Sequence, residues 1–254
     1  MTIHNGERLG SAPTQDSQLY PDTDGKPMAV SDEHRRVLTQ ILRTLEHFFT
    51  HRPEVYVSGD LLMYYVQGDP RKSVAPDVLV SFGIGQKARR TYLVWQEGKP
   101  PDFVMELASE STYQNDLGGK MQLYAHLGIA DYFLCDIEGL YLPTPLMGFT
   151  LVDGVYQPIA AATDGSLHSA VLGLDFHLRL SDLRLYDPEK GDWLLTPEAA
   201  ADARAEQETA RAEQEAARAE QEAIARRQAD ARAEAAEMEV AELRAALDRL
   251  QENS

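Results

Sequence analysis

The stretch PPDFVMELASESTYQNDLGGKMQLYAHLGIADYFLCD, residues 100–136, decides the fold of this chain. It opens with an apolar, strand-like run that ends at Ala108 and continues with apolar residues at helical spacing as far as Gly128. It closes with a second strand-like run, IADYFLCD. The first run also contains Glu106, and a buried carboxylate costs several kcal/mol unless it is paired, protonated or bound to a metal. The same stretch therefore predicts both a sheet and a site.

The segments before this stretch predict one helix and two strands. Residues 31–53 have an apolar stripe at helical spacing, with Ser31 or Asp32 as the cap. Runs 54–66 and 74–83 are rich in β-branched and aromatic residues and predict strands, the first with a bend at Gly59. The order helix, three strands, helix, strand predicts an α/β sandwich with a mixed central sheet.

The segments after this stretch predict further β structure. Residues 148–159 have the pattern of a hairpin with Asp153-Gly154 at its turn. Residues 172–195 add short strands and loops that complete the body near residue 197. The chain is thereby divided into an N-terminal segment, 1–27, a body, 28–197, and a C-terminal helix, 198–254.

Composition and charge exclude several classes of protein. The sequence has no apolar run long enough to span a membrane, and its polar N-terminus has no signal-peptide core, so we expect a cytoplasmic protein. The single cysteine, Cys135, lies in an apolar run and is expected to be buried and reduced. A net charge of −17 argues against avid non-specific DNA binding, because proteins that grip phosphates present a basic face.

The C-terminal helix carries a seven-residue repeat. The units RAEQETA, RAEQEAA and RAEQEAI begin at Arg204, Arg211 and Arg218. Such a repeat of strong helix formers predicts an α-helical coiled coil that pairs two chains into a homodimer. The apolar seam is mostly alanine at first and is better near the end, at Val240, Leu243, Leu247 and Leu250. The alternative is a solvated single helix held by Glu/Arg pairs.

Two carboxylates on neighbouring predicted strands are the main candidates for chemistry. Asp77 opens the second strand and Glu106 lies within the third. Two carboxylates close together repel each other, and a divalent cation between them relieves the repulsion; oxygen ligands of this kind suit Mg²⁺ or Mn²⁺. The alternative is that Asp77 belongs to a turn and Glu106 is an edge residue.

Lys120 is the third candidate. Asp116 and Lys120 are four residues apart on the predicted helix, capped by Asn115 or Asp116, and could form a modest surface ion pair. Lys120 could instead reach back toward the carboxylates, with Asp116 holding it. Ser109 and Ser111, just after the strand, could cap the turn or contact a phosphate.

Three segments in order, YPDTDGKPMAVSDEHRRVL, VAPDVLVSFG and the stretch from residue 100, resemble the Uma-two-type family of restriction endonucleases in the PD-(D/E)XK nuclease superfamily. The resemblance covers about residues 20–190. It implies a restriction-endonuclease-like αβββαβ core in which Asp77 and Glu106 are the acidic residues of the motif. The lysine expected two residues after Glu106 is Ala108, and Lys120 occupies the position where this family has a lysine on the following helix.

The resemblance implies a metal-dependent endonuclease that acts on DNA. Asp77 and Glu106 would bind Mg²⁺ or Mn²⁺, and Lys120 would complete the catalytic set. The alternative is a non-catalytic binding or scaffold protein that keeps the nuclease fold and acts through its coiled coil. The acidity, Ala108 and the long helix favour this alternative.

Overall fold

The computed structural model describes Tyr20 and residues 31–252, with no side-chain description for Leu243 and residues 245–252. The chain divides into two compact units, Met1–Pro197 and Glu198–Ser254. The predicted N-terminal segment, 1–27, lies outside the described residues except for Tyr20, whose ring packs on Tyr64 and Trp95.

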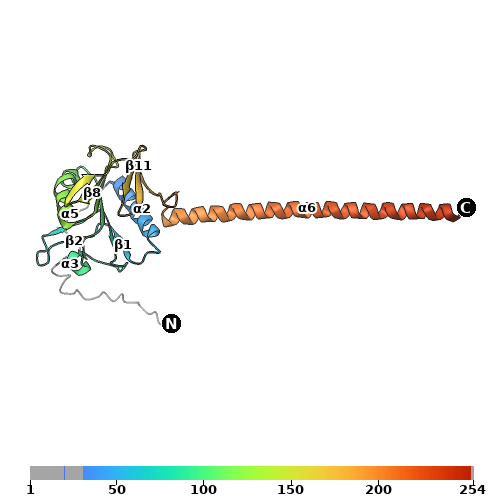
Figure 1. The fold of residues 1–254 in the computed structure, drawn as a ribbon, viewed down its shortest axis with the longest axis horizontal. Helices are drawn as coiled ribbons and strands as arrows, with labels where there is room; N and C mark the ends of the chain where they lie inside the picture. The colour runs from blue at the N-terminus through green and yellow to red at the C-terminus, as the bar shows by residue number, and fades with distance from the viewer. Residues whose placement is uncertain (1–19, 21–30, 253–254) are drawn as a thin grey trace, which may run out of the picture. The chain divides into compact units, whose positions relative to one another are not determined.

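A six-stranded sheet forms the centre of the first unit (Figure 1). Its strands, in spatial order, are β1 (Val55–Ser58), β4 (Val78–Phe82), β6 (Phe103–Leu107), β7 (Asp131–Cys135), β8 (Leu146–Val152) and β9 (Val155–Pro158). Only β6 and β7 run parallel, and the other neighbours are antiparallel. The predicted mixed sheet is confirmed, and so is the order helix, three strands, helix, strand.

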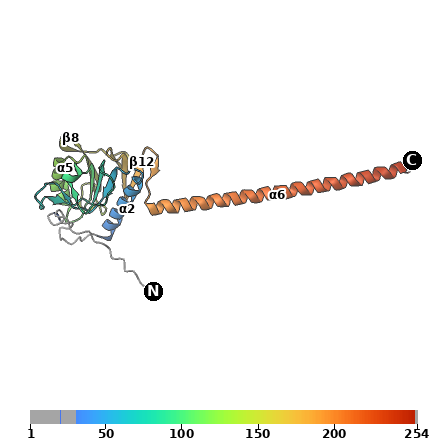
Figure 2. The ribbon, with the colours of Figure 1, turned by 90° about the horizontal axis from the view of Figure 1, so that it is seen from below.

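Helix α2 (Asp32–Phe48) packs on one face of this sheet (Figures 1 and 2). Its apolar stripe, which includes Val37, Ile41 and Leu45, is buried in the same core as Val78 and Met105. The predicted cap is confirmed, because the Ser31 hydroxyl accepts a hydrogen bond from the backbone N–H of His34 at 3.1 Å. This capping bond satisfies one of the free N–H groups in the first turn of the helix.

The opposite face of the sheet packs against a second helical segment. It comprises α4 (Tyr113–Asn115), the π-helical turn η1 (Asp116–Lys120) and α5 (Met121–Leu127). Alternate residues of β6 point to opposite faces: Phe103, Met105 and Leu107 join the core under α2, whereas Val104 joins the core under α5. Glu106 is two residues after Val104, so its side chain points to the same face, which this helical segment covers.

Two smaller sheets complete the body. An antiparallel sheet contains β10 (Leu167–Ser169), β11 (Leu174–Arg179), β12 (Asp182–Asp187) and β13 (Asp192–Trp193). A short sheet contains β3 (Ser73–Val74), β2 (Met63–Tyr64) and β5 (Tyr92–Leu93), and the short helix α3 (Val94–Glu97) follows β5. The predicted hairpin between β8 and β9 is confirmed: Asp153 and Gly154 have φ of 51° and 79°, as a tight hairpin turn requires.

The prediction of a single strand over 54–66 is wrong, although the chain does turn at the predicted bend, Gly59. The segment divides into β1 and β2, which belong to different sheets. The chain turns at Gly59 and Asp60, where Asp60 has a left-handed φ of 50° and its N–H donates to the Pro76 carbonyl at 3.0 Å. A Cβ on Gly59 would lie 2.1 Å from the Asp77 carbonyl oxygen, so this close approach requires glycine.

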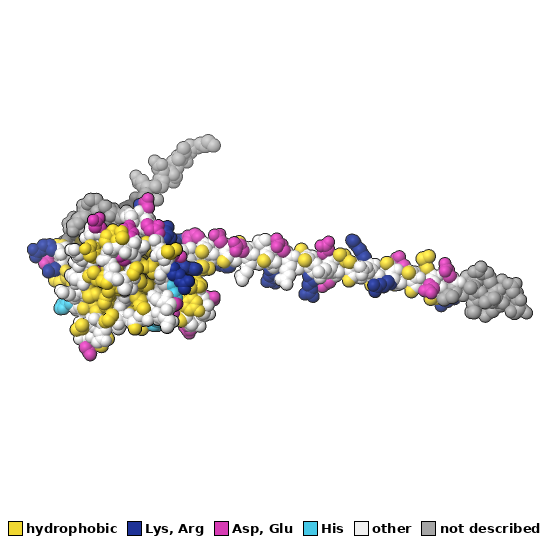
Figure 3. Space-filling model, turned by 90° about the horizontal axis from the view of Figure 1, so that it is seen from above, with side chains coloured by type: hydrophobic (Ala, Val, Ile, Leu, Met, Phe, Trp, Pro, Cys, Tyr) yellow, Lys and Arg dark blue, Asp and Glu magenta, His cyan; other side chains and the backbone are white. Residues whose placement is uncertain are grey.

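The second unit is the helix α6 (Pro197–Glu252). Residues 201–242 are exposed in this chain, and acidic and basic side chains are interspersed along the helix (Figure 3). Arg211 pairs with Glu215 and Arg218 with Glu222, each at 3.0 Å. The long helix is confirmed, whereas the coiled coil stays a prediction, and the side chains of Leu243, Leu247 and Leu250 lie outside the described residues.

Two further predictions concern membrane-spanning segments and the single cysteine. No helix within the described part of the chain is long and apolar enough to cross a membrane. Cys135 is buried on β7, as predicted, and burial raises its thiol pKa to about 12.

We expect Gly59→Ala to lower the free energy of unfolding by about 1–3 kcal/mol, because the new methyl group would overlap backbone that cannot move independently of Asp77. Denaturant unfolding measures this difference. Gly118→Ala is the control, because nothing lies within 4 Å of its added Cβ. Equal stability of Gly59→Ala and wild type would contradict the close approach.

Candidate active site

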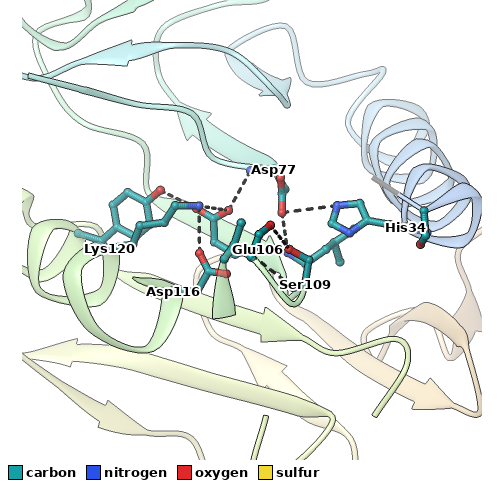
Figure 4. A network of polar contacts seen from close by, with 11 residues as sticks. His34, Asp77, Glu106, Ser109, Asp116 and Lys120 are labelled. Carbon is teal, nitrogen blue, oxygen red and sulfur yellow. Dashed lines mark hydrogen bonds and ion pairs between the residues drawn. The ribbon is translucent and has the colours of Figure 1, made fainter. Parts of the chain in front are cut away.

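Glu106 is the centre of a buried polar network. The residue is fully buried on β6, between β4 and β7, so the reading of Glu106 as an edge residue is wrong. The Tyr124 hydroxyl donates to Oε1 at 2.6 Å, and the Lys120 ammonium lies 2.8 Å from Oε2 (Figure 4). Both partners come from the helical segment that covers this face of the sheet. The burial of Glu106 is therefore compensated by a charged partner and by a hydroxyl group.

Lys120 contacts two carboxylates at once. Its ammonium is 3.0 Å from Asp116 Oδ1 as well as 2.8 Å from Glu106. The pair between Asp116 and Lys120 exists, but the alternative that it lies on the surface is wrong, since Asp116 is fully buried and only 15% of the Lys120 side chain is exposed. The Asp116 carboxylate makes no hydrogen bond with any residue that the structure describes, so the ion pair is what offsets its burial.

The helix that carries Lys120 starts earlier than predicted. It begins at Tyr113, and Asp116 opens the π-helical turn, so neither Asn115 nor Asp116 is the cap. The predicted end is confirmed at Gly128, which has a left-handed φ of 85°. In the turn that enters this helix, the Ser109 hydroxyl lies 3.2 Å from the Ser111 hydroxyl and 3.0 Å from the Thr112 hydroxyl.

Asp77 lies beside Glu106, just before β4. The backbone N–H of Leu107 donates to Asp77 Oδ2 at 2.7 Å, and the N–H of Asp77 donates to Glu106 Oε2 at 3.4 Å. These reciprocal contacts follow from the antiparallel pairing of β4 with β6, in which Val78 faces Met105. The structure thus brings all three predicted residues, Asp77, Glu106 and Lys120, into one network.

His34 also belongs to this network, although the sequence did not predict it. It lies in the first turn of α2, is 8% exposed, and its Nε2 is 4.0 Å from Asp77 Oδ2. Burial lowers its pKa, and Asp60, Asp116 and Glu138 act in the opposite direction. Figure 4 shows His34 and Lys120 approaching the carboxylates from opposite sides. No local pattern marks His34, because its partner is distant in the sequence.

Tyr124 also escaped selection, although a signal for it exists. Asp116, Lys120 and Tyr124 follow one another at intervals of four residues, the spacing of one helical face. The Tyr124 hydroxyl is buried, and burial raises its pKa well above the usual value. The neighbouring Glu106 raises this pKa further. Tyr124 therefore remains a neutral hydrogen-bond donor to Glu106.

Burial dominates the electrostatics of the carboxylates. It raises the pKa of Glu106 to about 8, against the attraction of Lys120. It raises the pKa of Asp77 to about 6, against the hydrogen bond from Leu107. Burial acts to lower the pKa of Lys120. The attraction of Glu106, and then that of Asp116, is stronger together, so the pKa of Lys120 is raised. A further cation near the two acids would favour their charged forms.

The donor set fits a divalent cation that needs few protein ligands. Asp77 and Glu106 offer only oxygen atoms, which suit Mg²⁺ and Mn²⁺. Among the described residues, no group of three or more His, Cys, Asp or Glu side chains is arranged to hold a metal. Mg²⁺ is usually held by one or two carboxylates, with water and substrate phosphates completing its shell. Asp77 and Glu106 therefore fit a Mg²⁺ ion whose other ligands are water and substrate phosphate, and they do not fit an ion held by side chains alone.

The raised pKa of Glu106 makes stability depend on pH. Because the folded protein holds a proton that the unfolded chain releases above its ordinary pKa of 4.5, this contribution is full below that value and is lost as pH rises toward about 8. Glu106→Gln removes the titration. From pH 5 to pH 8, we expect the unfolding free energy of wild type to fall relative to this variant by at least about 1 kcal/mol.

Denaturant unfolding at several pH values without divalent metal measures this difference. Glu54→Gln, at an exposed position, is the control and should show no such trend. A constant difference between wild type and Glu106→Gln across this range would contradict the raised pKa.

Comparison with known proteins places the chain in a family. The family model Uma2, described as "Putative restriction endonuclease", matches residues 12–181. A search of curated proteins found no match. A solved structure titled "Crystal structure of a putative nuclease belonging to DUF820 from Anabaena variabilis ATCC 29413" is 16% identical, with a TM-score of 0.43, and the alignment covers 59% of this chain and 80% of that one.

The family match includes α2, all of the central strands and the helical segment that carries Lys120. It therefore spans each residue of the network described above. The resemblance inferred from the sequence motifs is confirmed, and the chain belongs to the Uma2 family of restriction-endonuclease-type proteins.

Proposed function

We propose that this protein is a metal-dependent endonuclease that hydrolyses phosphodiester bonds in DNA. The observation that carries the proposal is the buried network in which Lys120 lies 2.8 Å from Glu106, with Asp77 beside it. A network of two acids and an ammonium in a family of restriction-endonuclease type is suited to phosphoryl transfer, which depends on positioning and charge stabilisation.

In this proposal Asp77 and Glu106 hold Mg²⁺ or Mn²⁺. The bound ion would polarise the scissile phosphate and lower the pKa of an attacking water. Leu107 and Tyr124 keep the two carboxylates in place through their hydrogen bonds.

Lys120 has a separate role. Its ammonium stays charged because Glu106 and Asp116 flank it, so it supplies a fixed positive charge for the oxygen atoms of the phosphate in the transition state. An ammonium held in this way cannot accept the proton of the attacking water. Lys120 is therefore assigned to orientation and charge stabilisation.

Plasmid cleavage with Mg²⁺ or Mn²⁺ tests the proposal. We expect Asp77→Asn, Glu106→Gln and Lys120→Met each to reduce the rate by at least about 100-fold. The first two weaken the proposed metal site, and the third removes the positive charge beside the phosphate. Asp32→Asn is the control, because its side chain is 94% exposed. If cleavage survives in Lys120→Met alone, the nuclease assignment stands and the lysine assignment fails.

The rival function is a binding or scaffold protein that retains the nuclease fold, which the net charge of −17 favours. Metal-induced stabilisation separates the two functions, because a metal that binds only the folded protein raises its melting temperature. The nuclease proposal requires such a rise at millimolar Mg²⁺ and its loss in Asp77→Asn. Absence of both cleavage and stabilisation in wild type would favour the scaffold.

We further propose that α6 pairs two chains as a homodimer. The support is the seven-residue repeat and the apolar residues toward its end, beginning at Val240, which is 46% exposed in the single chain. Light scattering should give a dimer mass for the full chain and a monomer mass for a chain that ends at residue 197. A monomer in both cases would establish the solvated single helix held by Arg/Glu pairs instead.

A further inference from the structure

A pocket of about 420 Å³ adjoins the carboxylate network. It lies where the parallel strands β6 and β7 end, and its lining includes residues that follow both strands. His34 connects the two sites, because it lines the pocket and its Nε2 is 4.0 Å from Asp77 Oδ2. A group bound in the pocket would therefore be next to a phosphate bound at the proposed metal site of Asp77 and Glu106.

The charge of the pocket excludes a phosphate as its occupant. Glu33, Glu110 and Glu138 line it, and the described lining residues include no lysine or arginine. Carboxylates repel a phosphate and accept hydrogen bonds from N–H groups. The pocket is therefore suited to an uncharged group that is rich in N–H donors.

Tyr141 gives the pocket an aromatic side chain, and Tyr113, outside the lining, supports its ring. Tyr141 lines the pocket and stacks on Tyr113, with ring centroids 5.7 Å apart and an angle of 30° between the rings. The Tyr141 hydroxyl donates to Glu138 Oε2 at 3.0 Å, so a ring face and a carboxylate are held side by side. Flat rings with N–H donors at their edge match such a surface, because they can stack and donate at once.

His34 supplies a further polar group. Its side chain is nine-tenths buried, and within the described part of the chain its ring makes no hydrogen bond. The ring therefore places a polar group at the boundary between the pocket and Asp77.

We propose that this pocket binds one nucleobase of the substrate strand, next to the scissile phosphate. The inference rests on the proposed nuclease function and specifies its substrate. A pocket of this volume holds a base but not a double helix, so the base must be unstacked and the substrate is single-stranded DNA or a duplex with an extruded nucleotide. Guanine is the preferred base, because its Watson–Crick edge presents two neighbouring donors to one carboxylate.

Nucleoside binding to the full chain without metal tests the pocket directly. Guanosine, cytidine and uridine carry no phosphate, so their binding, followed by NMR of the nucleoside, reports only on the base and the sugar. We expect guanosine to bind best and uridine least. Tyr141→Ala should weaken guanosine binding about tenfold through loss of stacking, whereas Tyr141→Phe should retain it.

Glu138→Gln provides a second variant at an exposed position. It should reduce the preference for guanosine over uridine, because the amide replaces one of the two acceptor oxygens of the carboxylate by a donor NH2 group. Equal binding of the three nucleosides, or equal binding by wild type and Tyr141→Ala, would overturn the proposal.

Cleavage assays separate this inference from the proposed function. We expect faster cleavage of single-stranded oligonucleotides than of duplexes, and a raised KM for Tyr141→Ala with little change in kcat. Asp77→Asn should lose cleavage and keep guanosine binding. Cleavage by wild type without nucleoside binding would overturn the pocket assignment alone, and guanosine binding without cleavage would overturn the nuclease proposal alone.

Discussion

The buried contact between the Lys120 ammonium and the Glu106 carboxyl group is the interaction on which the site and its surroundings depend. A carboxylate in the middle of a buried strand is unfavourable without a partner, and the 2.8 Å contact with Lys120, together with the Tyr124 hydroxyl, compensates it. This compensation requires the helical segment from Tyr113 to Leu127 to lie on that face of β6. A carboxylate that is unfavourable in isolation, Glu106, thus requires this helical segment to pack against it.

The lysine of the site comes from the helical segment and not from the strand. A residue two positions after Glu106 shares its face of the strand, and this position is occupied by Ala108. The helix that covers the face brings an ammonium to the same carboxylate from a different element. The π-helical turn Asp116–Lys120 and the pairing with Asp116 hold it there, so one face can contain three charged groups and remain buried.

In the proposed function, the site and the pocket divide the chemistry of a nucleotide between them. Asp77, Glu106 and Lys120 combine acids that a cation would ionise with an ammonium that stays charged, which suits a phosphate and its metal. The neighbouring pocket has carboxylates and Tyr141, whose ring stacks on Tyr113, and these groups suit a base. His34 lies between the two. An acidic chain can therefore act on a nucleic acid if recognition depends on the base as much as on the backbone.

The sequence by itself determined the features that depend on neighbouring residues. The apolar run in residues 101–109 predicted a strand in which Glu106 points to one face. Ser31 and Gly128 marked helix ends, and Asp153-Gly154 marked a turn, because each of these features rests on local geometry. Tertiary structure decided the division of residues 54–66, the early start of the helix at Tyr113 and the place of His34 beside Asp77. These depend on contacts between distant segments, such as Gly59 against the Asp77 carbonyl, which no local pattern records.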